Sequence, residues 1–225
     1  MNHTYTQIHF FYLKSFTAKC WAFTQMQLAH SVLTKVPGLQ FYKLLGTGGG
    51  DGYQWQPDFG TYALLTVFES KQQAEAFAHH PWLTAYLKRC TQVKTFILQA
   101  FEGHGFWDAK QPFEIFPHNE SFPVAVLTRA KIKWQFLHRF WQKVPKVSAS
   151  LTQYPGQLFG KGIGELPLIQ QATFSVWENK QAVMAYAYQN PKHREVVQMT
   201  RRLGWYAEEM FVRFMVVDTH LKKNM

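Results

Sequence analysis

The sequence predicts an α+β fold of two tandem ferredoxin-like units, each with the element order βαββαβ, whose antiparallel sheets face each other. Two observations lead to this expectation. An internal repeat divides the 225-residue chain into halves, and each half shows the same succession of strand-like and helix-like segments. Helices on one face of a sheet leave the other face uncovered, so two such sheets would cover each other.

The repeat is visible in two pairs of segments. LQFYKLLGTG follows Pro37-Gly38, and QLFGKGIGEL follows Pro155-Gly156. TYALLTVFESKQQAEAFAHHP then corresponds to QATFSVWENKQAVMAYAYQNP. Each copy has a Pro-Gly turn, an aromatic strand with a lysine and glycines, a strand ending in an aromatic residue and a glutamate, and a Lys-Gln helix broken at a proline. This shared order of unlike elements indicates a duplication with a period of about 110 residues.

Runs rich in Tyr, Phe and Val predict four strands in each half. They cover residues 7–13, 40–46, 61–68, 93–101, 123–132, 158–165, 170–177 and 209–217. Apolar spacing of the helical period predicts helices between them, and Pro81 is expected to break or restart one of these helices. The helices cover residues 18–36, 71–90, 133–147, 180–189 and 191–203. The expected units are therefore residues 1–104 and 123–225, joined by a linker at 105–122 that is rich in Gly, Pro and aromatic residues.

Composition narrows the class of protein. With 47% hydrophobic and 17% charged residues, the chain is too apolar to be disordered. No run of 18 apolar residues predicts a membrane-spanning helix, and the N-terminal residues do not read as a secretory signal. Two distant cysteines match no metal or redox spacing. We therefore expect a reduced, cytoplasmic protein without a disulfide framework.

The charge is uneven along the chain. Residues 1–120 hold 9 basic and 8 acidic residues, which gives +1, and residues 121–225 hold 15 and 6, which gives +9. A basic half suits an acidic protein or an anionic membrane surface, and solubility alone explains it equally well. Because the aromatic residues do not alternate with Lys and Arg in a recognisable motif, no nucleic-acid partner is expected.

His193 is the most informative of the ten histidines. It lies in the first turn of a short helix that begins at Pro191, with Asn190 as the cap. Helical spacing places it on the apolar face, together with Val196, Val197, Thr200 and Leu203. An imidazole that points inward needs a partner. It is either a hydrogen-bonded core histidine or the axial ligand of an iron cofactor held between helix and sheet.

Other residues of the second half are candidates for the same site. Phe159, Trp177 and Trp205 fit a core, and they also fit the tall aromatic slot that a flat macrocycle or a long polyene requires. Arg129 and Lys161 are either edge residues or cations on an inner sheet wall. In the second case they would pair with a propionate of a cofactor or polarise bound dioxygen.

Several segments, in order along most of the chain, resemble one known family. They are WAFTQM (21–26), PGLQFYKLLGTG (37–48), VLTRAKI (126–132), RFWQKVP (139–145), GIGELP (162–167), QATFSVW (171–177), the region around His193, and GWYAEEMFVRF (204–214). They resemble the spheroidene monooxygenase family of carotenoid biosynthesis. The resemblance implies a dimeric α/β barrel and a haem b enzyme that uses dioxygen and reduced ferredoxin to oxidise C2 of an acyclic carotenoid, giving a ketone or an alcohol.

The resemblance also bears on the site and the partners. In several haem enzymes of this barrel type the axial histidine lies on the second helix of a ferredoxin-like unit, the place that His193 occupies. His138 is the alternative ligand. The expected partners are the carotenoid, a ferredoxin-type electron donor and the inner face of the membrane, and a homodimer is compatible with the sequence. Two alternatives stay open: a cofactor-free oxygenase or isomerase that uses an acid or base such as His138, and a non-catalytic haem or lipophile-binding protein.

Overall fold

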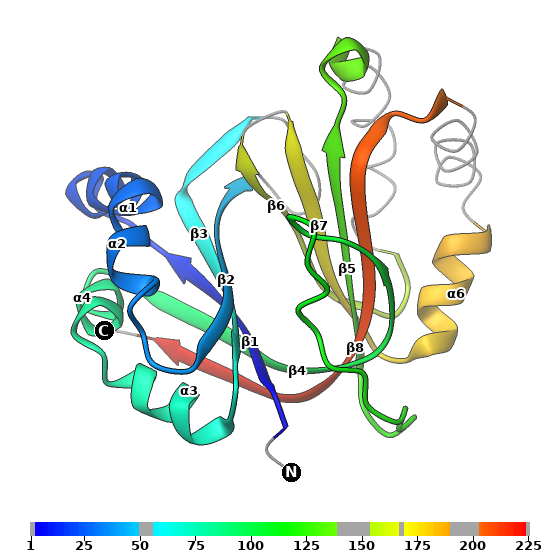
Figure 1. Cartoon of the computed structure of the whole chain (residues 1–225), viewed down its shortest axis with the longest axis horizontal. Helices are drawn as coiled ribbons and strands as arrows, with labels where there is room; N and C mark the ends of the chain where they lie inside the picture. The colour runs from blue at the N-terminus through cyan, green and yellow to red at the C-terminus, as the bar shows by residue number, and fades with distance from the viewer. Residues whose placement is uncertain (1–2, 50–55, 139–153, 167–168, 190–202, 224–225) are drawn as a thin grey trace.

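The strands form a closed antiparallel barrel in the order β1-β3-β2-β6-β7-β5-β8-β4 (Figure 1). This computed structural model describes residues 3–49, 56–138, 154–166, 169–189 and 203–223. The strands are β1 (Tyr5–Tyr12), β2 (Leu39–Gly48), β3 (Pro57–Phe68), β4 (Gln92–Gly105), β5 (Val124–Ile132), β6 (Gln157–Leu166), β7 (Gln170–Trp177) and β8 (Tyr206–Lys223). The helices are α1 (Phe16–Leu28), α2 (His30–Leu33), α3 (Lys71–Ala78), α4 (Pro81–Leu87), the 3-10 helix η1 (Trp134–Phe136) and α6 (Lys180–Gln189).

Each half of the chain contributes four neighbouring strands, β4-β1-β3-β2 and β6-β7-β5-β8. The two sets are joined edge to edge along two seams. The β4–β8 seam is long and runs from Gln92 to Gly105, whereas the β2–β6 seam consists of the pairs Gly46–Gly164 and Thr47–Ile163. The two sheets that were expected to face each other do so as parts of one continuous barrel, which closes firmly at the β4–β8 seam and through two residue pairs at the β2–β6 seam.

The interior of the barrel is filled by aromatic side chains. Phe159 lies 4.8 Å from Phe10 and 5.2 Å from Phe96, measured between ring centroids, and Phe174 lies 5.4 Å from Phe96. Rings at these separations and tilts pack as they do in ordinary protein cores. The barrel is therefore a packed core and leaves no channel for a substrate along its axis.

The helices of the first half begin where the sequence offers caps. The side chain of Ser15 accepts a hydrogen bond from the backbone N–H of Ala18 at the start of α1, and that of Ser70 does the same for Gln73 at the start of α3. Pro81 begins α4, so the expected restart of the helix at this proline is confirmed. The single helix expected at 18–36 is instead two helices, α1 and α2.

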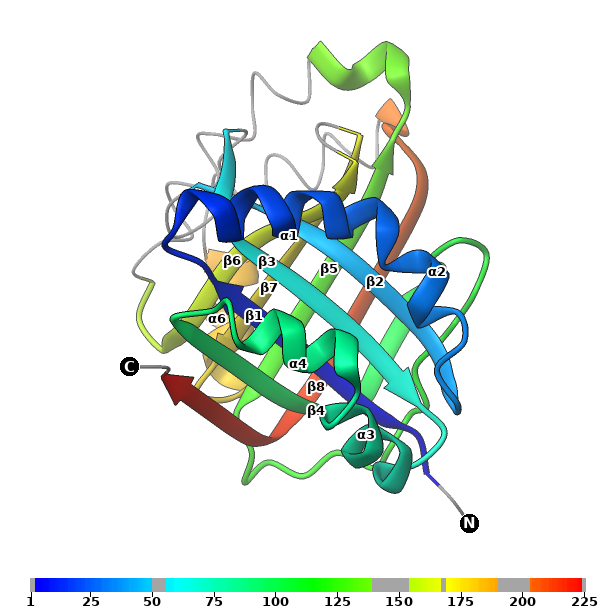
Figure 2. The same ribbon diagram turned by 90° about the vertical axis from the view of Figure 1, so that its left-hand side faces the viewer.

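The helices divide unequally between the two halves. Four of them, α1 to α4, cover the outer face of the first half, and α1 and α4 cross its strands in Figure 2. In the second half α6 packs on one end of the outer face through Val183 and Tyr186. Of the helix expected at 133–147 the structure describes residues 133–138, which hold η1, and the rest lies outside the described residues. The helix expected at 191–203 lies outside them except for Leu203. No described helix is long and apolar enough to cross a membrane.

The segment expected as a linker packs against the barrel. Trp107 is fully buried and belongs to the interior core. The chain reaches this position through Gly105, whose φ of +84° is in the left-handed region that favours glycine and whose added Cβ would lie 2.1 Å from the carbonyl oxygen of Glu209. Asp108 and Ala109 then turn the chain back with φ of 50° and 58°. Residues 105–110 thus close one end of the barrel.

We expect Trp107→Ala to lower the free energy of unfolding by about 3–5 kcal/mol, because it removes a fully buried indole from a packed core. Urea unfolding followed by circular dichroism measures this. Phe106→Ala is the matched control, since Phe106 is the neighbouring residue and 49% exposed; its effect should stay within about 0.5 kcal/mol. Equal effects of the two substitutions would contradict a structural role for Trp107.

Candidate functional site

The barrel register shows which residues of the two halves are equivalent. Lys43 of β2 pairs with Leu65 of β3, and Lys161 of β6 pairs with Phe174 of β7. Both lysines lie three residues before the glycine of the β2–β6 seam. The duplicated segments of the sequence therefore superimpose strand on strand, and side chains at matching positions can be compared directly.

On the outer face, β6 carries glycines where β2 carries bulky residues. Tyr42 and Leu44 of β2 correspond to Gly160 and Gly162 of β6, and Gly164 continues the same face. Leu44 packs into the core under the helices of the first half. The second half has no side chain at the corresponding place, although Gly162 is itself buried.

The neighbouring strands show the same loss of bulk. Phe11 and Tyr62, which pair across β1 and β3, are buried side chains of the first half. Their counterparts Ala130 and Gln171 pair across β5 and β7. The strands β5, β6 and β7 of the second half therefore carry smaller or more flexible side chains on their outer face than β1, β2 and β3 of the first half.

We call this surface the small-residue face. Its members are Thr128, Ala130, Gly160, Gly162, Gly164 and Thr173. The strand β5 crosses it and, with nine residues, spans about 26 Å at about 3.3 Å per residue. The glycines contribute no side chains of their own, which suits a flat ligand that lies close to the backbone. The carboxamide of Gln157 lies beside Gly160, 2.4 Å from the position that an added Cβ would take, and that of Gln171 lies 3.4 Å from the corresponding position at Gly164.

Trp177 and Trp205 lie at opposite ends of this outer face. Trp177 packs 5.2 Å from Tyr186 of α6, and its indole N–H donates to the hydroxyl of Ser175 at 2.9 Å. Trp205 packs on Ile132 at the other end of β5. The two tryptophans expected at the cofactor site therefore share one face, whereas Phe159 lies inside the barrel on the opposite side of the sheet.

Arg129 and Lys161 also point into the barrel. Arg129 is 1% exposed and forms an ion pair with Glu208 of β8. Lys161 is nearly as buried, and its ammonium lies 3.5 Å from the carboxylate of Asp58. The sheet separates both cations from the small-residue face. The catalytic contact suggested for them by the sequence stays a prediction.

Arg129 belongs to a cluster of charges around Trp107. Its guanidinium lies 5.6 Å from the ring of Trp107, and the ammonium of Lys43 lies 5.5 Å from that ring. The indole N–H donates to Glu165 at 2.7 Å, and Lys43 pairs with Glu165 at 2.5 Å and with Asp108. A buried cation is stable only when it is paired, and here each cation has carboxylate partners.

Glu208 fastens the turn that carries Trp107. Its carboxylate accepts hydrogen bonds from the backbone N–H groups of Asp108 at 3.1 Å and Ala109 at 2.8 Å. Burial acts to raise the pKa of Glu208, but the hydrogen bonds from Ala109, Arg129 and Asp108 outweigh it and hold the pKa below its ordinary value. The carboxylate stays ionised and couples the former linker to β5 and β8.

The histidines cannot all be placed. His193, the expected iron ligand, lies outside the described residues. His138 is exposed at the end of η1. Among the residues that the structure describes, no three of His, Cys, Asp and Glu are grouped so as to hold a metal ion.

Sequence reasoning missed the cluster around Trp107. Lys43 and Lys161 occupy the same position of the repeat, and this could have indicated that Lys43 faces the barrel as Lys161 does. The partners could not be deduced, because Asp108, Glu165 and Glu208 come from three distant parts of the chain.

Comparisons with known proteins define the family. A scan of protein-family models finds no match. The chain is 32% identical over 203 residues to the spheroidene monooxygenase of Rhodobacter capsulatus. The aligned segment covers 88% of this chain and 84% of that protein. It is 31% identical to the one from Rubrivivax gelatinosus, covering 88% of this chain and 76% of the relative. This chain belongs to the spheroidene monooxygenase family.

Members of this family are oxidoreductases, and this chain is an enzyme of the monooxygenase class. The relative from Cereibacter sphaeroides is longer: it is 30% identical over 93% of this chain, which covers 65% of its length. Among solved structures, an aldoxime dehydratase is similar with a TM-score of 0.66 and 10% identity, covering 100% of this chain and 86% of the other. A second, in complex with butyraldoxime, has a TM-score of 0.65. At this identity the likeness shows the shared barrel fold alone.

Glu208→Gln should lower the free energy of unfolding at neutral pH by about 1.5–3 kcal/mol, because charge-assisted hydrogen bonds to a buried guanidinium and two N–H groups are weakened. The folded pKa of Glu208 lies below the unfolded value of about 4.3. Its contribution is therefore complete above that value and is lost as the pH falls through the folded pKa.

Denaturant unfolding as a function of pH checks this. The gap between the native protein and Glu208→Gln should narrow as the medium becomes acidic. Glu209→Gln, at the next and exposed position, is the control and should change stability little at neutral pH. A gap that is independent of pH would show that the charge of Glu208 does not contribute.

Proposed function

We propose that this chain is a haem-dependent monooxygenase that uses dioxygen and electrons from reduced ferredoxin to oxidise C2 of an acyclic carotenoid. Membership of the spheroidene monooxygenase family supports the substrate class and the reaction type. One structural observation supports the cofactor. The outer face of the second half has Gly160, Gly162 and Ala130 where the first half has Tyr42, Leu44 and Phe11.

The small-residue face fits a flat macrocycle. The glycines of β6 contribute no side chains of their own, and Trp177 and Trp205 bound the face at its two ends. His193 would supply an iron ligand from the helix that the sequence predicts after Pro191. Leu203, which helical spacing puts on the same face as His193, packs in the cluster of Ile132 and Trp205. That contact supports the expectation that this face is directed toward β5.

Bound haem would supply the activation of dioxygen: one oxygen atom enters a C–H bond of the substrate, and the other leaves as water with two electrons from ferredoxin and two protons. The protein would hold the haem and the substrate and shield them from water. The packed rings of Phe159 and Phe174 stand behind the sheet and keep water out of the wall. We place Arg129 and Lys161 in the same wall, where their ion pairs fix β5 and β6 in position.

The wider arrangement follows from the same reasoning. We infer that the two halves, residues 1–104 and 123–225, are tandem ferredoxin-like units, since both show the same strand order. The charge of +9 on residues 121–225 would attract an acidic ferredoxin, and it would favour peripheral contact with the inner face of the membrane. The setting is then cytoplasmic.

The first test is an absorption spectrum of protein expressed with a supply of haem. The native protein should show a Soret band, and His193→Ala should lose most of the bound haem because the axial bond is removed. His138→Ala is the matched control and should retain the band. Loss of the band only in His138→Ala would transfer the ligand to His138, and a native protein without a Soret band would favour the cofactor-free alternative.

The second test adds a bulky side chain to the small-residue face. Gly162→Leu restores the side chain that the equivalent residue Leu44 has in the first half, and we expect it to reduce haem occupancy about tenfold or more, because the leucine occupies the place of the macrocycle. Haem content per chain measures this. Gln7→Leu, which places a leucine on the outer face of the first half, away from the proposed haem, should leave haem content unchanged.

Activity separates an enzyme from a passive binder. With dioxygen and reduced ferredoxin, the haem protein should convert an acyclic carotenoid to a product oxygenated at C2, and omission of either should stop the conversion. Haem binding without any conversion would favour the non-catalytic alternative.

A further inference from the structure

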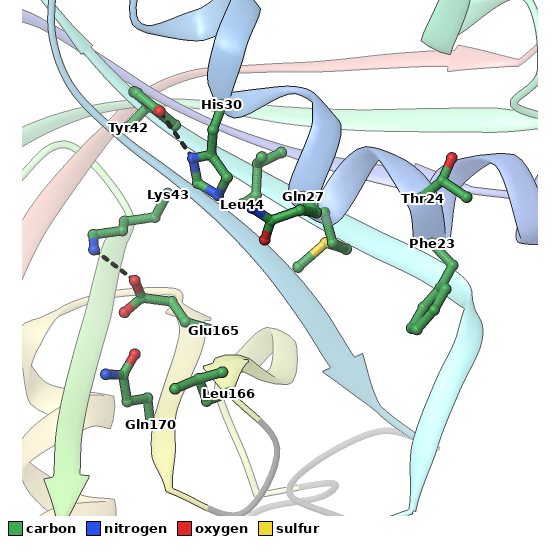
Figure 3. A pocket seen from close by; sticks show the side chains of 11 residues that line it. Phe23, Thr24, Gln27, His30, Tyr42, Lys43, Leu44, Glu165, Leu166 and Gln170 are labelled. Carbon is green, nitrogen blue, oxygen red and sulfur yellow. Dashed lines mark hydrogen bonds and ion pairs between the residues drawn. The ribbon is translucent and has the colours of Figure 1, made fainter.

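A cleft on the outside of the barrel is unassigned by the proposal above. It has a volume of about 640 Å³ and lies between α1, α2, β2, the end of β6 and the start of β7 (Figure 3). This volume is within the range of about 300–1,000 Å³ typical of small-molecule sites. The cleft is located at the short β2–β6 seam, where the two halves of the barrel meet.

The two ends of the cleft differ in chemistry. Phe23 lies at one end, on α1, and His30 and Tyr42 lie toward the other, whereas Leu166 lies beside Gln170 on the opposite wall (Figure 3). The phenol of Tyr42 is hydrogen-bonded to Nδ1 of His30 at 2.9 Å. A ligand that matches this lining makes apolar contacts with Phe23 and Leu166 and carries a hydrogen-bonding oxygen near Tyr42.

The cleft offers little net charge to a ligand. Lys43 reaches it, but its ammonium is paired with both Glu165 and Asp108. An anionic ligand would have to compete with two carboxylates for this cation. The cleft therefore favours a neutral ligand.

The apolar end is exposed without a cover from the described residues. Phe23 is 59% exposed and Leu166 is 51% exposed, although both line a concave surface. Phe23 also contacts Phe59 edge to face at 5.9 Å, and Phe59 is exposed as well. Apolar side chains grouped at the mouth of a cleft are typical of a binding surface for an apolar partner.

The cleft borders the small-residue face. Leu166 follows Gly164 by two residues on β6, across a register shift in the pairing with β7, so the cleft ends beside the last glycine of that strand. An extended molecule that occupies the cleft can therefore continue over the β2–β6 seam onto the glycines.

We propose that this cleft binds the remote part of a long, neutral, apolar polyene, with Phe23 and Leu166 against the chain and Tyr42 and His30 near a terminal hydroxyl or ether oxygen. The inference rests on the proposed function and deepens it, because it assigns the substrate-selecting residues to the first half and the seam. The reacting end then lies over the second half.

The test uses the full-length haem protein and two probes in detergent micelles: an acyclic carotene and the same polyene with one terminal hydroxyl. A bound polyene acquires circular dichroism in its visible absorption band, which reports binding without turnover. Phe23→Asp with Leu166→Asp should weaken binding of both probes about tenfold or more, since apolar contact is replaced by charges. Tyr42→Phe should weaken only the hydroxylated probe.

Phe16→Asp is the matched control. Phe16 is 80% exposed, lies on the face of α1 that carries Phe23, and does not line the cleft. It should bind both probes as the native protein does. Phe16, Phe23 and Leu166 are exposed, and Tyr42→Phe keeps the ring of a half-buried residue, so unchanged thermal unfolding is expected in every variant and is checked first.

The outcomes separate the two proposals. Unchanged affinity of the Phe23→Asp, Leu166→Asp variant for both probes overturns the cleft assignment, whatever the haem content. If the native protein carries no haem and oxidises nothing, but binds the polyenes, and the Phe23→Asp, Leu166→Asp variant loses that binding, the cleft assignment stands and the proposed function is wrong. If the native protein turns the carotenoid over and this variant does so with an unchanged KM, the function stands and the cleft assignment fails.

Discussion

Closure of the barrel is the constraint on which the rest of the structure depends. Once β4 pairs with β8 and β2 with β6, the inner faces of both sheets become a single core. Phe10, Phe96 and Phe159 pack together in it. The outer face of each half, by contrast, can change without disturbing this shared core.

The closure is secured at one end by a segment that joins the two halves. Trp107 inserts between Lys43 of the first half and Arg129 of the second, and carboxylates of Asp108, Glu165 and Glu208 balance the two cations. Each of these groups is expensive to bury alone. Together they make the position of β2 relative to β5 and β8 depend on one turn of the connecting chain.

The sequence revealed the elements better than their assembly. Period-two patterns and the Pro81 break gave the strands and the α3–α4 boundary because these are local properties of the chain. The sequence could not predict on which side of the sheet Phe159 lies. Alternation along a strand does not identify the core face when both faces carry apolar residues. The partners of Arg129 were equally hidden, because its ion pair with Glu208 joins residues that are 79 positions apart and leaves no periodic signal.

Duplication explains why the outer faces have diverged. In the first half, Leu44 and Tyr62 must fill the space below four helices, and their loss would leave a cavity there. The second half can lose the equivalent bulk at Gly162 only if something else occupies the outer side of β6, because a buried glycine strand with no packing partner is weakly held. The haem that we propose would satisfy that requirement, and the proposed cleft would extend the same binding surface toward the seam. In this proposal the first half is the rigid, fully packed wall, and the second half holds the cofactor and the reacting end of a long apolar substrate.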